Sequence, residues 1–105
     1  MPKGYVIFTE RVHDPVRFEK YKRLALDAGI KYGTKALVIT DSPEIPEGEW
    51  HGPRTVVLEF ESVEVARRWY NSPEYQAVIG IRHESVESNA IIASGFEMPN
   101  GYASP

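Results

Sequence analysis

The chain is 105 residues long, carries a formal net charge of −3 and contains no cysteine. This length suits a single domain, and the acidic balance argues against nucleic acid, because phosphate binding needs a basic surface. The lack of cysteine excludes disulfides, thiolate nucleophiles and cysteine-based metal sites. Apolar runs are about five residues long, whereas a membrane-spanning helix needs ~20. No secretory segment is visible before the first predicted strand, so we expect a cytoplasmic protein that does not bind membranes.

The first part of the chain predicts a strand, a helix and a second strand. Residues 5–12 (YVIFTERV) are rich in aromatic and β-branched side chains, which favour a strand. Asp14 and Pro15 are typical of a helix start, and apolar residues follow at helical spacing until glycines close the pattern. We therefore expect a helix over 15–30 and then a strand over 35–40 (KALVIT).

The second part of the chain predicts a long loop and another strand–helix–strand unit. Ser62 is a good N-cap, and Ser72 with Pro73 restarts a helix after a break. In order, we expect a loop over 41–53, a strand over 54–61, helices over 63–70 and 73–82, and a strand over 89–96.

This order, βαββαβ, predicts a ferredoxin-like α+β sandwich with a four-stranded antiparallel sheet. We place the domain at residues 1–97 and expect 98–105 to be a flexible tail. The strand segments Leu37–Ile39, Val56–Leu58 and Ile91–Ala93 are apolar on both faces, although the helices can cover only one. We therefore expect a homodimer that pairs these sheet faces about a two-fold axis. The alternative is a second face that is moderately apolar and partly wet.

Several short motifs resemble one known family. They are Trp69–Gln76 (WYNSPEYQ), Glu59–Phe60, Ala66, Tyr32–Gly33, Glu47–Trp50 and Arg82. Together they are similar to the family called domain of unknown function 1330, within the dimeric α/β-barrel superfamily, over about residues 4–97. The resemblance implies a ferredoxin-like protomer, a homodimer with facing sheets and a pocket for an unidentified ligand. The loop over 40–52 is slightly longer than the family pattern, which could alter access to the pocket.

Glu59 is the candidate catalytic residue. Alternation along its strand predicts that Val56, Leu58 and Phe60 face the helices and that Glu59 faces the opposite side. A carboxylate covered there by a second subunit needs a partner, or its pKa rises, as in many general acids and bases. The alternative is a structural ion pair or hydrogen bond, with Arg11, Arg54 and Arg82 as possible partners.

Arg82 is the candidate anion- or carbonyl-binding residue. Tyr75, Val78 and Arg82 fall on one stripe of their helix, so the planar guanidinium could hold a ligand beside Tyr75. The alternative is a charge that complements the dipole at the end of the helix. Trp69 and its neighbours could form an aromatic wall or ordinary core packing, and Trp50 could be a lid or a dimer contact. The residues predicted to bind substrate are Arg82, Tyr70, Tyr75, Trp69, Trp50 and Arg54.

The three histidines, His13, His51 and His83, form no metal-ligand motif, so we expect no metal and no cofactor. The superfamily that the chain resembles includes cofactor-free monooxygenases, isomerases and dehydratases that act on ring compounds. The resemblance thus implies a small homodimeric protein with a small-molecule pocket, and a cofactor-free enzyme is one reading. The alternative reading is a non-catalytic ligand-binding or interaction module, in which Glu59 and the arginines form a structural network.

Overall fold

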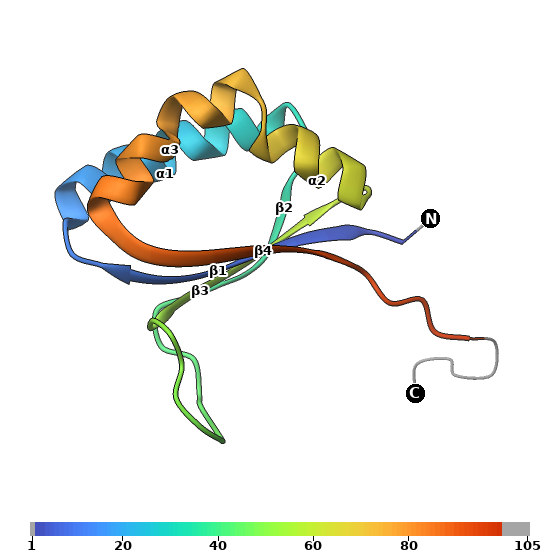
Figure 1. The fold of residues 1–105 in the computed structure, drawn as a ribbon, viewed down its shortest axis with the longest axis horizontal. Coiled ribbons are helices and arrows are strands. Elements are labelled where there is room, and N and C mark those ends of the chain that lie inside the picture. The colour runs from blue at the N-terminus through green and yellow to red at the C-terminus, as the bar shows by residue number, and fades with distance from the viewer. Residues whose placement is uncertain (1, 100–105) are drawn as a thin grey trace.

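The computed structural model describes residues 2–99, and its helices all lie on one face of a single sheet (Figure 1). The elements are β1 (Gly4–Val12), α1 (Pro15–Ile30), β2 (Lys35–Thr40), β3 (Arg54–Phe60), α2 (Val63–Tyr70), α3 (Pro73–Ser85) and β4 (Val86–Ser94). The sheet has four antiparallel strands in the order β2-β3-β1-β4. The predicted element order and antiparallel sheet are therefore confirmed.

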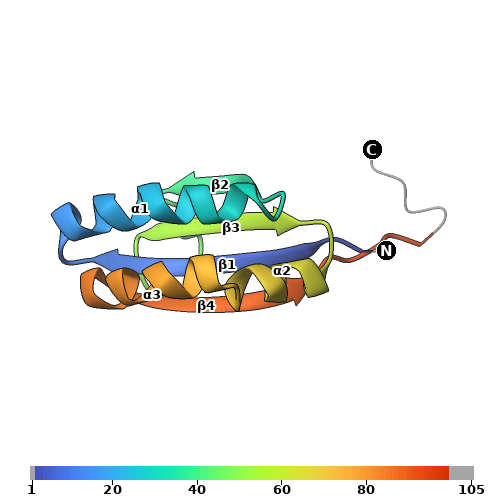
Figure 2. The same ribbon diagram turned by 90° about the horizontal axis from the view of Figure 1, so that it is seen from above.

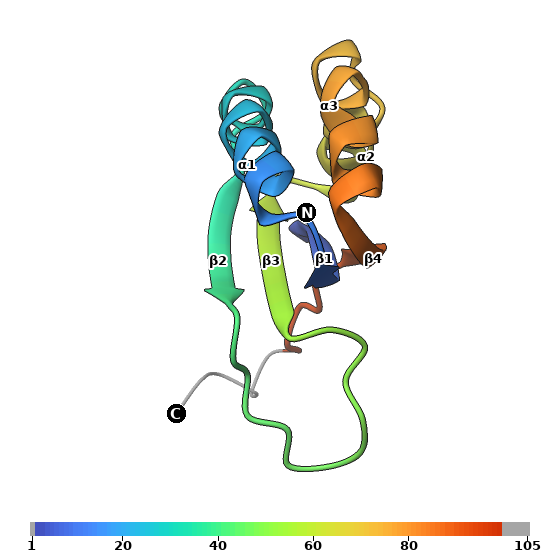
Figure 3. The same cartoon turned by 90° about the vertical axis from the view of Figure 1, so that its left-hand side faces the viewer.

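The helices form two rows above the sheet. Seen from above and end-on, α1 runs over β2 and β3, whereas α2 and α3 run over β1 and β4 (Figures 2 and 3). None of the helices within residues 2–99 is long and apolar enough to cross a membrane. The loop between β2 and β3 extends below the sheet, on the side away from the helices (Figure 1).

The helix starts follow the local sequence chemistry. The side chain of Asp14 accepts a hydrogen bond from the backbone N–H of Arg17 at 3.1 Å, and α1 then begins at a proline. Ser62 and Ser72 cap α2 and α3 in the same way, accepting from backbone N–H groups three residues later. These bonds satisfy amides that the helix itself leaves free, which is why the predicted starts are confirmed.

The boundary between α3 and β4 differs from the prediction. The strand runs from Val86 to Ser94 rather than over 89–96, and it follows α3 without a loop. The Ser85 hydroxyl donates to the Ile81 carbonyl at 2.6 Å, and Val86 pairs with Val12 of β1. These contacts end the helix and begin the strand at once, which the sequence did not reveal. Of the predicted tail 98–105, residues 100–105 lie outside the described residues.

The hydrophobic core fills much of the layer between the helices and the sheet. Val6 and Phe60 come from the sheet and Trp69 and Tyr75 from the helices, and each is at most 2% exposed. The ring centroids of Trp69 and Tyr75 are 4.2 Å apart, so the predicted aromatic cluster at the helix break is part of this core. This packing anchors α2 and α3 to β1, β3 and β4.

Within residues 2–99, much of the opposite face of the sheet is open, although the β2–β3 loop lies on that side and Trp50 hydrogen-bonds Thr55 there. Strand register places Val38, Val57, Ile7 and Ile91 side by side across all four strands of that face, and we call these four residues the apolar row. Val38 is 43% exposed and Ile91 56% exposed. The face that was predicted to need a second subunit is thus apolar and open in the single chain.

Candidate functional site

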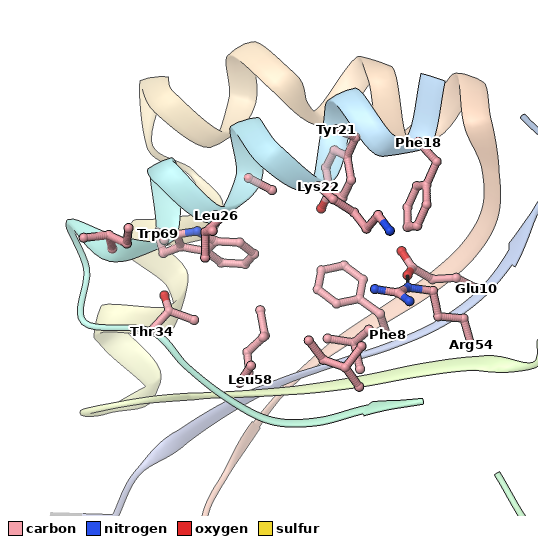
Figure 4. Close-up of a pocket in the computed structure, with 16 residues that line it drawn as sticks. Phe8, Glu10, Phe18, Tyr21, Lys22, Leu26, Thr34, Arg54, Leu58 and Trp69 are labelled. Atoms are coloured by element: carbon pink, nitrogen blue, oxygen red, sulfur yellow. Dashed lines mark ion pairs between the residues drawn. The ribbon is translucent and has the colours of Figure 1, made fainter. Parts of the chain in front are cut away.

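A cavity of about 310 Å³ lies between α1 and the β2–β3 side of the sheet (Figure 4). Its walls are largely apolar, with Phe8, Phe18, Val56 and Leu58 among the lining residues. Small residues explain why the space is not filled, because Ala25 and Gly29 of α1 and Ala36 of β2 all line it. Protein interiors are otherwise close-packed, so a cavity of this size is a candidate ligand site.

One end of the cavity carries a buried ion pair. Figure 4 shows Glu10 of β1 and Arg54 of β3 side by side, and Arg54 Nε lies 3.3 Å from Glu10 Oε1. Glu10 is only 3% exposed. Burial raises the pKa of the Glu10 carboxyl, and the positive charges of Arg54 and Arg82 oppose that rise. Arg54 also contacts Asp41 at 3.2 Å, on the solvent side.

The loop before β3 packs against the backbone of β1 at Glu10. Gly52 is buried against β1, and a Cβ atom there would lie 2.6 Å from the carbonyl carbon and oxygen of Glu10. Such a separation is well inside van der Waals contact, so only glycine permits the approach. The chain thereby shields the backbone of Glu10 from solvent.

Arg82 lies behind the same end of the cavity, at the C-terminal part of α3. It is 3% exposed, its guanidinium sits 5.0 Å from the Phe8 ring centroid, and its Nη1 donates to Ser88 Oγ at 2.5 Å. Within residues 2–99 no carboxylate lies at ion-pair distance from Arg82. The side chain therefore points into the protein rather than serving as an exposed charge at the end of the helix.

Two tyrosines link α1 to α3 beside these charges. The hydroxyls of Tyr21 and Tyr75 are 2.7 Å apart, and both residues are buried. Burial raises the pKa of Tyr21 far above its usual range, and the neighbouring Tyr75 adds to the effect. Burial also raises the pKa of Tyr75, although the charge of Arg82 works against it. Tyr21 lines the cavity, so one neutral hydroxyl of this pair is at its wall.

The far end of the cavity holds unpaired polar atoms. Trp69 Nε1 and Thr34 Oγ1 are buried and have no hydrogen-bond partner among the described residues. Both residues line the cavity, and Figure 4 shows them opposite the Glu10–Arg54 end. Because a buried donor without a partner costs free energy, a polar atom placed here would be stabilising.

The structure brings most of the predicted binding residues together. Arg54 and Trp69 line the cavity, and Tyr75 and Arg82 lie directly behind its wall. Tyr70 packs against Trp69 and Tyr75, with ring centroids 6.2 and 5.6 Å apart. Of these three aromatic residues, Trp69 alone lines the cavity, and Tyr70 and Tyr75 pack behind it as part of the core.

Glu59 and Trp50 lie on the other side of the sheet. The predicted facing of Glu59 is confirmed, but its partner is Tyr5, whose hydroxyl donates to the carboxylate at 2.9 Å, and not an arginine. Trp50 is 47% exposed and donates from Nε1 to Thr55 Oγ1 at 2.9 Å. The sheet therefore separates Glu59 from Arg82 within one chain, and the two do not share a pocket there.

Glu10 and Tyr21 belong to the site but were not singled out from the sequence. Glu10 continues the alternation of Val6 and Phe8, which face the helices, so its phase was a usable signal of a buried carboxylate. Tyr21 sits at a core-facing helical position, where its hydroxyl needed a partner.

No metal centre is evident in the part of the chain that the structure describes, where no three histidine, aspartate or glutamate residues lie together. His13, His51 and His83 are all exposed. The expectation that the protein uses neither metal nor cofactor stays a prediction.

The fold and the cavity define a ferredoxin-like α+β domain with an internal pocket under one helix. Residues 3–96 match the family described as "Domain of unknown function (DUF1330)", and the chain belongs to that family. The family assignment made from the motifs is therefore confirmed. No curated protein matches the chain in sequence.

Solved structures show the same fold at low sequence identity. A protein of unknown function from Rhodopseudomonas palustris superposes with a TM-score of 0.73 at 15% identity, covering 92% of this chain and 85% of the other. SnoaB, a cofactor-independent oxygenase from Streptomyces nogalater, gives 0.62 at 11% identity, covering 95% and 99%. A dimeric protein of unknown function with a ferredoxin-like fold from Bacteroides fragilis gives 0.58 at 16% identity, covering 88% and 95%. Such identities establish the fold and not the activity.

Proposed function

We propose that this protein is a homodimer that binds a small, mainly apolar organic molecule in the cavity between α1 and the sheet. The observation that carries the proposal is an apolar cavity of about 310 Å³ with the buried Glu10–Arg54 pair at one end. Apolar walls with a few convergent polar groups are the usual composition of small-molecule sites, and this volume lies at the lower end of their range. The cavity also collects the unpaired atoms Trp69 Nε1 and Thr34 Oγ1.

Glu10 favours catalysis as the further role of this site. Burial raises its pKa above the usual range of a carboxyl, which makes Glu10 a candidate to accept and return a proton. Tyr21 supplies a neutral hydroxyl at the same wall. The fold is shared with a cofactor-independent oxygenase, which supports a reaction that relies on protein side chains. We therefore propose proton transfer by Glu10 and assign Glu59 a structural role at the dimer interface.

The homodimer proposal rests on the apolar row, Val38, Val57, Ile7 and Ile91. One neighbouring row is polar, formed by Thr40, Thr55, Thr9 and Asn89, and the other contains Lys35 opposite Glu59. A two-fold axis through this face would pack the apolar row of one chain against the apolar row of the other. It would also allow Lys35 of one chain to pair with Glu59 of its partner. Two structural neighbours are described as dimeric ferredoxin-like proteins, which supports a second copy as the occupant.

The cavity can be tested by filling it. The chain has two tryptophans, so Trp50→Phe leaves Trp69, at the cavity wall, as the only tryptophan reporter. We expect a neutral naphthalene ketone such as 2-acetonaphthone to quench its fluorescence saturably. Ala25→Phe, which places a ring into the cavity from α1, should weaken this binding by at least about tenfold, because the space that the probe needs is occupied.

The matched control is Ala77→Phe, which adds the same ring at an exposed position of α3 outside the cavity. It should leave the affinity unchanged, and circular dichroism should show that both variants are folded. Equal binding by the Ala25→Phe variant and its parent, or no saturable quenching in the parent, would overturn the proposed site.

A further inference from the structure

We propose that the ligand of this cavity is a monoanion: an apolar, ring-sized organic acid whose charged oxygen atoms lie at the Glu10–Arg54 end. This inference rests on the proposed function and adds the chemical class of the ligand. It follows from the balance of buried charges, from the unused donor of Arg54 and from the shape of the cavity.

The buried charges at this end do not cancel. Arg54 and Arg82 contribute two positive charges, and Glu10 at most one negative charge. Asp41 also contacts Arg54, but its side chain is 80% exposed, so water screens its charge. Whether Glu10 is ionised or protonated, the enclosed region stays positive, and buried charge in proteins is normally balanced by a partner.

The two arginines also have unused donors. The Nε atoms of Arg54 and Arg82 are buried and lack a hydrogen-bond partner among residues 2–99. Arg54 Nε lies 3.3 Å from Glu10, close enough for an ion pair but without hydrogen-bond geometry. Arg54 lines the cavity, whereas Arg82 lies behind its wall and contributes only its charge. A guanidinium carries five donors and binds planar carboxylates best, so the oxygen atoms of an anion match the donors that Arg54 presents to this end.

Lys22 adds a third positive charge at the same end. It lines the cavity from α1, and Figure 4 shows its side chain extending towards Phe18 and Glu10. Its amine is 3.0 Å from Glu19, whose side chain is 63% exposed and therefore solvated. Positive groups thus surround the polar end from α1, α3 and β3, which favours entry of an anion.

The walls and the volume of the rest of the cavity determine the polarity and size of the uncharged part of the ligand. Between the charged end and Trp69 the walls are rings and aliphatic side chains, including Phe8 and Leu58 (Figure 4). An apolar body is therefore needed, and a volume of about 310 Å³ suits a molecule of one to three rings. At the far end, the unpaired Trp69 Nε1 and Thr34 Oγ1 could form hydrogen bonds with an oxygen atom of the ligand.

Three probes of similar shape and different charge test whether the cavity prefers an anion. We would titrate 2-naphthoate, neutral 2-acetonaphthone and cationic 2-naphthylmethylammonium into the Trp50→Phe protein and follow Trp69 fluorescence. We expect naphthoate to bind at least about tenfold more tightly than the ketone, because its carboxylate pairs with Arg54, and the cation to bind most weakly.

Charge variants then assign the effect to this end. Glu10→Gln removes a negative charge without changing shape, so naphthoate should bind about tenfold more tightly and the ketone equally well. Arg54→Gln should weaken naphthoate by at least about tenfold and spare the ketone. Lys20→Gln removes an exposed charge of α1 that does not line the cavity, and it should change neither affinity. If Arg54→Gln does not fold, Lys22→Gln, at the half-buried mouth, replaces it.

The outcomes separate this inference from the proposed function. If ketone and naphthoate bind equally, or if Glu10→Gln weakens naphthoate, the ligand is not an anion, whereas the cavity remains a binding site. If Ala25→Phe blocks none of the probes, or no probe binds, the proposed site itself fails, and the inference fails with it.

Discussion

The two faces of the sheet carry the same kinds of residues in different surroundings. Along β3, Val56 faces the helices and is 8% exposed, whereas Val57 beside it faces the uncovered side in the apolar row. Each face also holds one notable glutamate. Glu10, on the helix side, is buried and paired with Arg54, and Glu59, on the open side, accepts a hydrogen bond from Tyr5. The chemistry of a carboxylate here depends on which face of the strand it occupies.

This difference explains why the cavity side, and not the open side, is the proposed site. Burial raises the pKa of Glu10, and the nearby Arg54 and Arg82 give its surroundings a net positive charge. Glu59 instead raises the pKa of Tyr5 through their hydrogen bond, which suits a polar contact near an interface. In our proposal one face holds a ligand and the other meets a second copy, and the variants below test that division.

The largest effect is expected from placing a charge on each face of β3. Val56→Asp buries an unpaired carboxylate in the core and should destabilise the fold by about 4 kcal/mol or more, which is comparable to the stability of a small domain. Val57→Asp places the same charge in the apolar row, where two copies would bring like charges together. The dimer dissociation constant should rise at least about a hundredfold while each chain stays folded.

Light scattering and circular dichroism distinguish these results. The Val56→Asp protein should lose its folded spectrum, and the Val57→Asp protein should keep it but run as a monomer. A Val57→Asp protein that remains a dimer would show that the open face is not the interface, and the comparison between the two faces would need revision.

A smaller effect is expected from the tyrosine pair on the helix side. Tyr21→Phe removes one partner of the buried hydroxyl pair and should cost about 1 kcal/mol at neutral pH. The pKa of Tyr21 is raised in the folded state, so the fold favours the neutral hydroxyl. This contribution is fully present below the unfolded pKa of 10.0 and is lost as pH rises above it.

Urea denaturation at pH 7 and pH 11 measures both parts of this prediction. Tyr21→Phe should be less stable than its parent at pH 7, and the difference should narrow or reverse at pH 11. Tyr75, whose pKa is also raised, still contributes to alkaline unfolding in this variant. A stability difference that is the same at both pH values would mean that Tyr21 does not resist ionisation in the fold.

The sequence predicted the fold well because the signals are local. Asp14 and Ser72 cap helices through bonds that span three residues, and strand alternation placed Glu59 on the open face. The site was harder to predict because it depends on pairs far apart in the chain. Glu10 and Arg54 meet only when β1 and β3 align, and the hydroxyls of Tyr21 and Tyr75 meet only when α1 packs beside α3.

The cavity was the least predictable feature. It exists because the residues that α1 and β2 contribute to its walls include the small Ala25, Gly29 and Ala36. None of these small residues signals a cavity within its own helix or strand. They line one space only because of the way α1 packs on the sheet. The error at the start of β4 has a similar cause, since Val86 enters the strand through its pairing with Val12.

The smallest effect is expected from Glu59→Gln, which tests whether a glutamate on the open face contributes to ligand binding. The amide can still accept from the Tyr5 hydroxyl, so stability should change by less than about 1 kcal/mol. Naphthoate affinity should not change, because the sheet separates Glu59 from the cavity.

Glu10→Gln, the same substitution on the other face, should alter that affinity about tenfold. If Glu59→Gln instead abolished naphthoate binding while Glu10→Gln left it intact, the ligand would lie between the sheets of a dimer and Glu59 would regain the role predicted from the sequence.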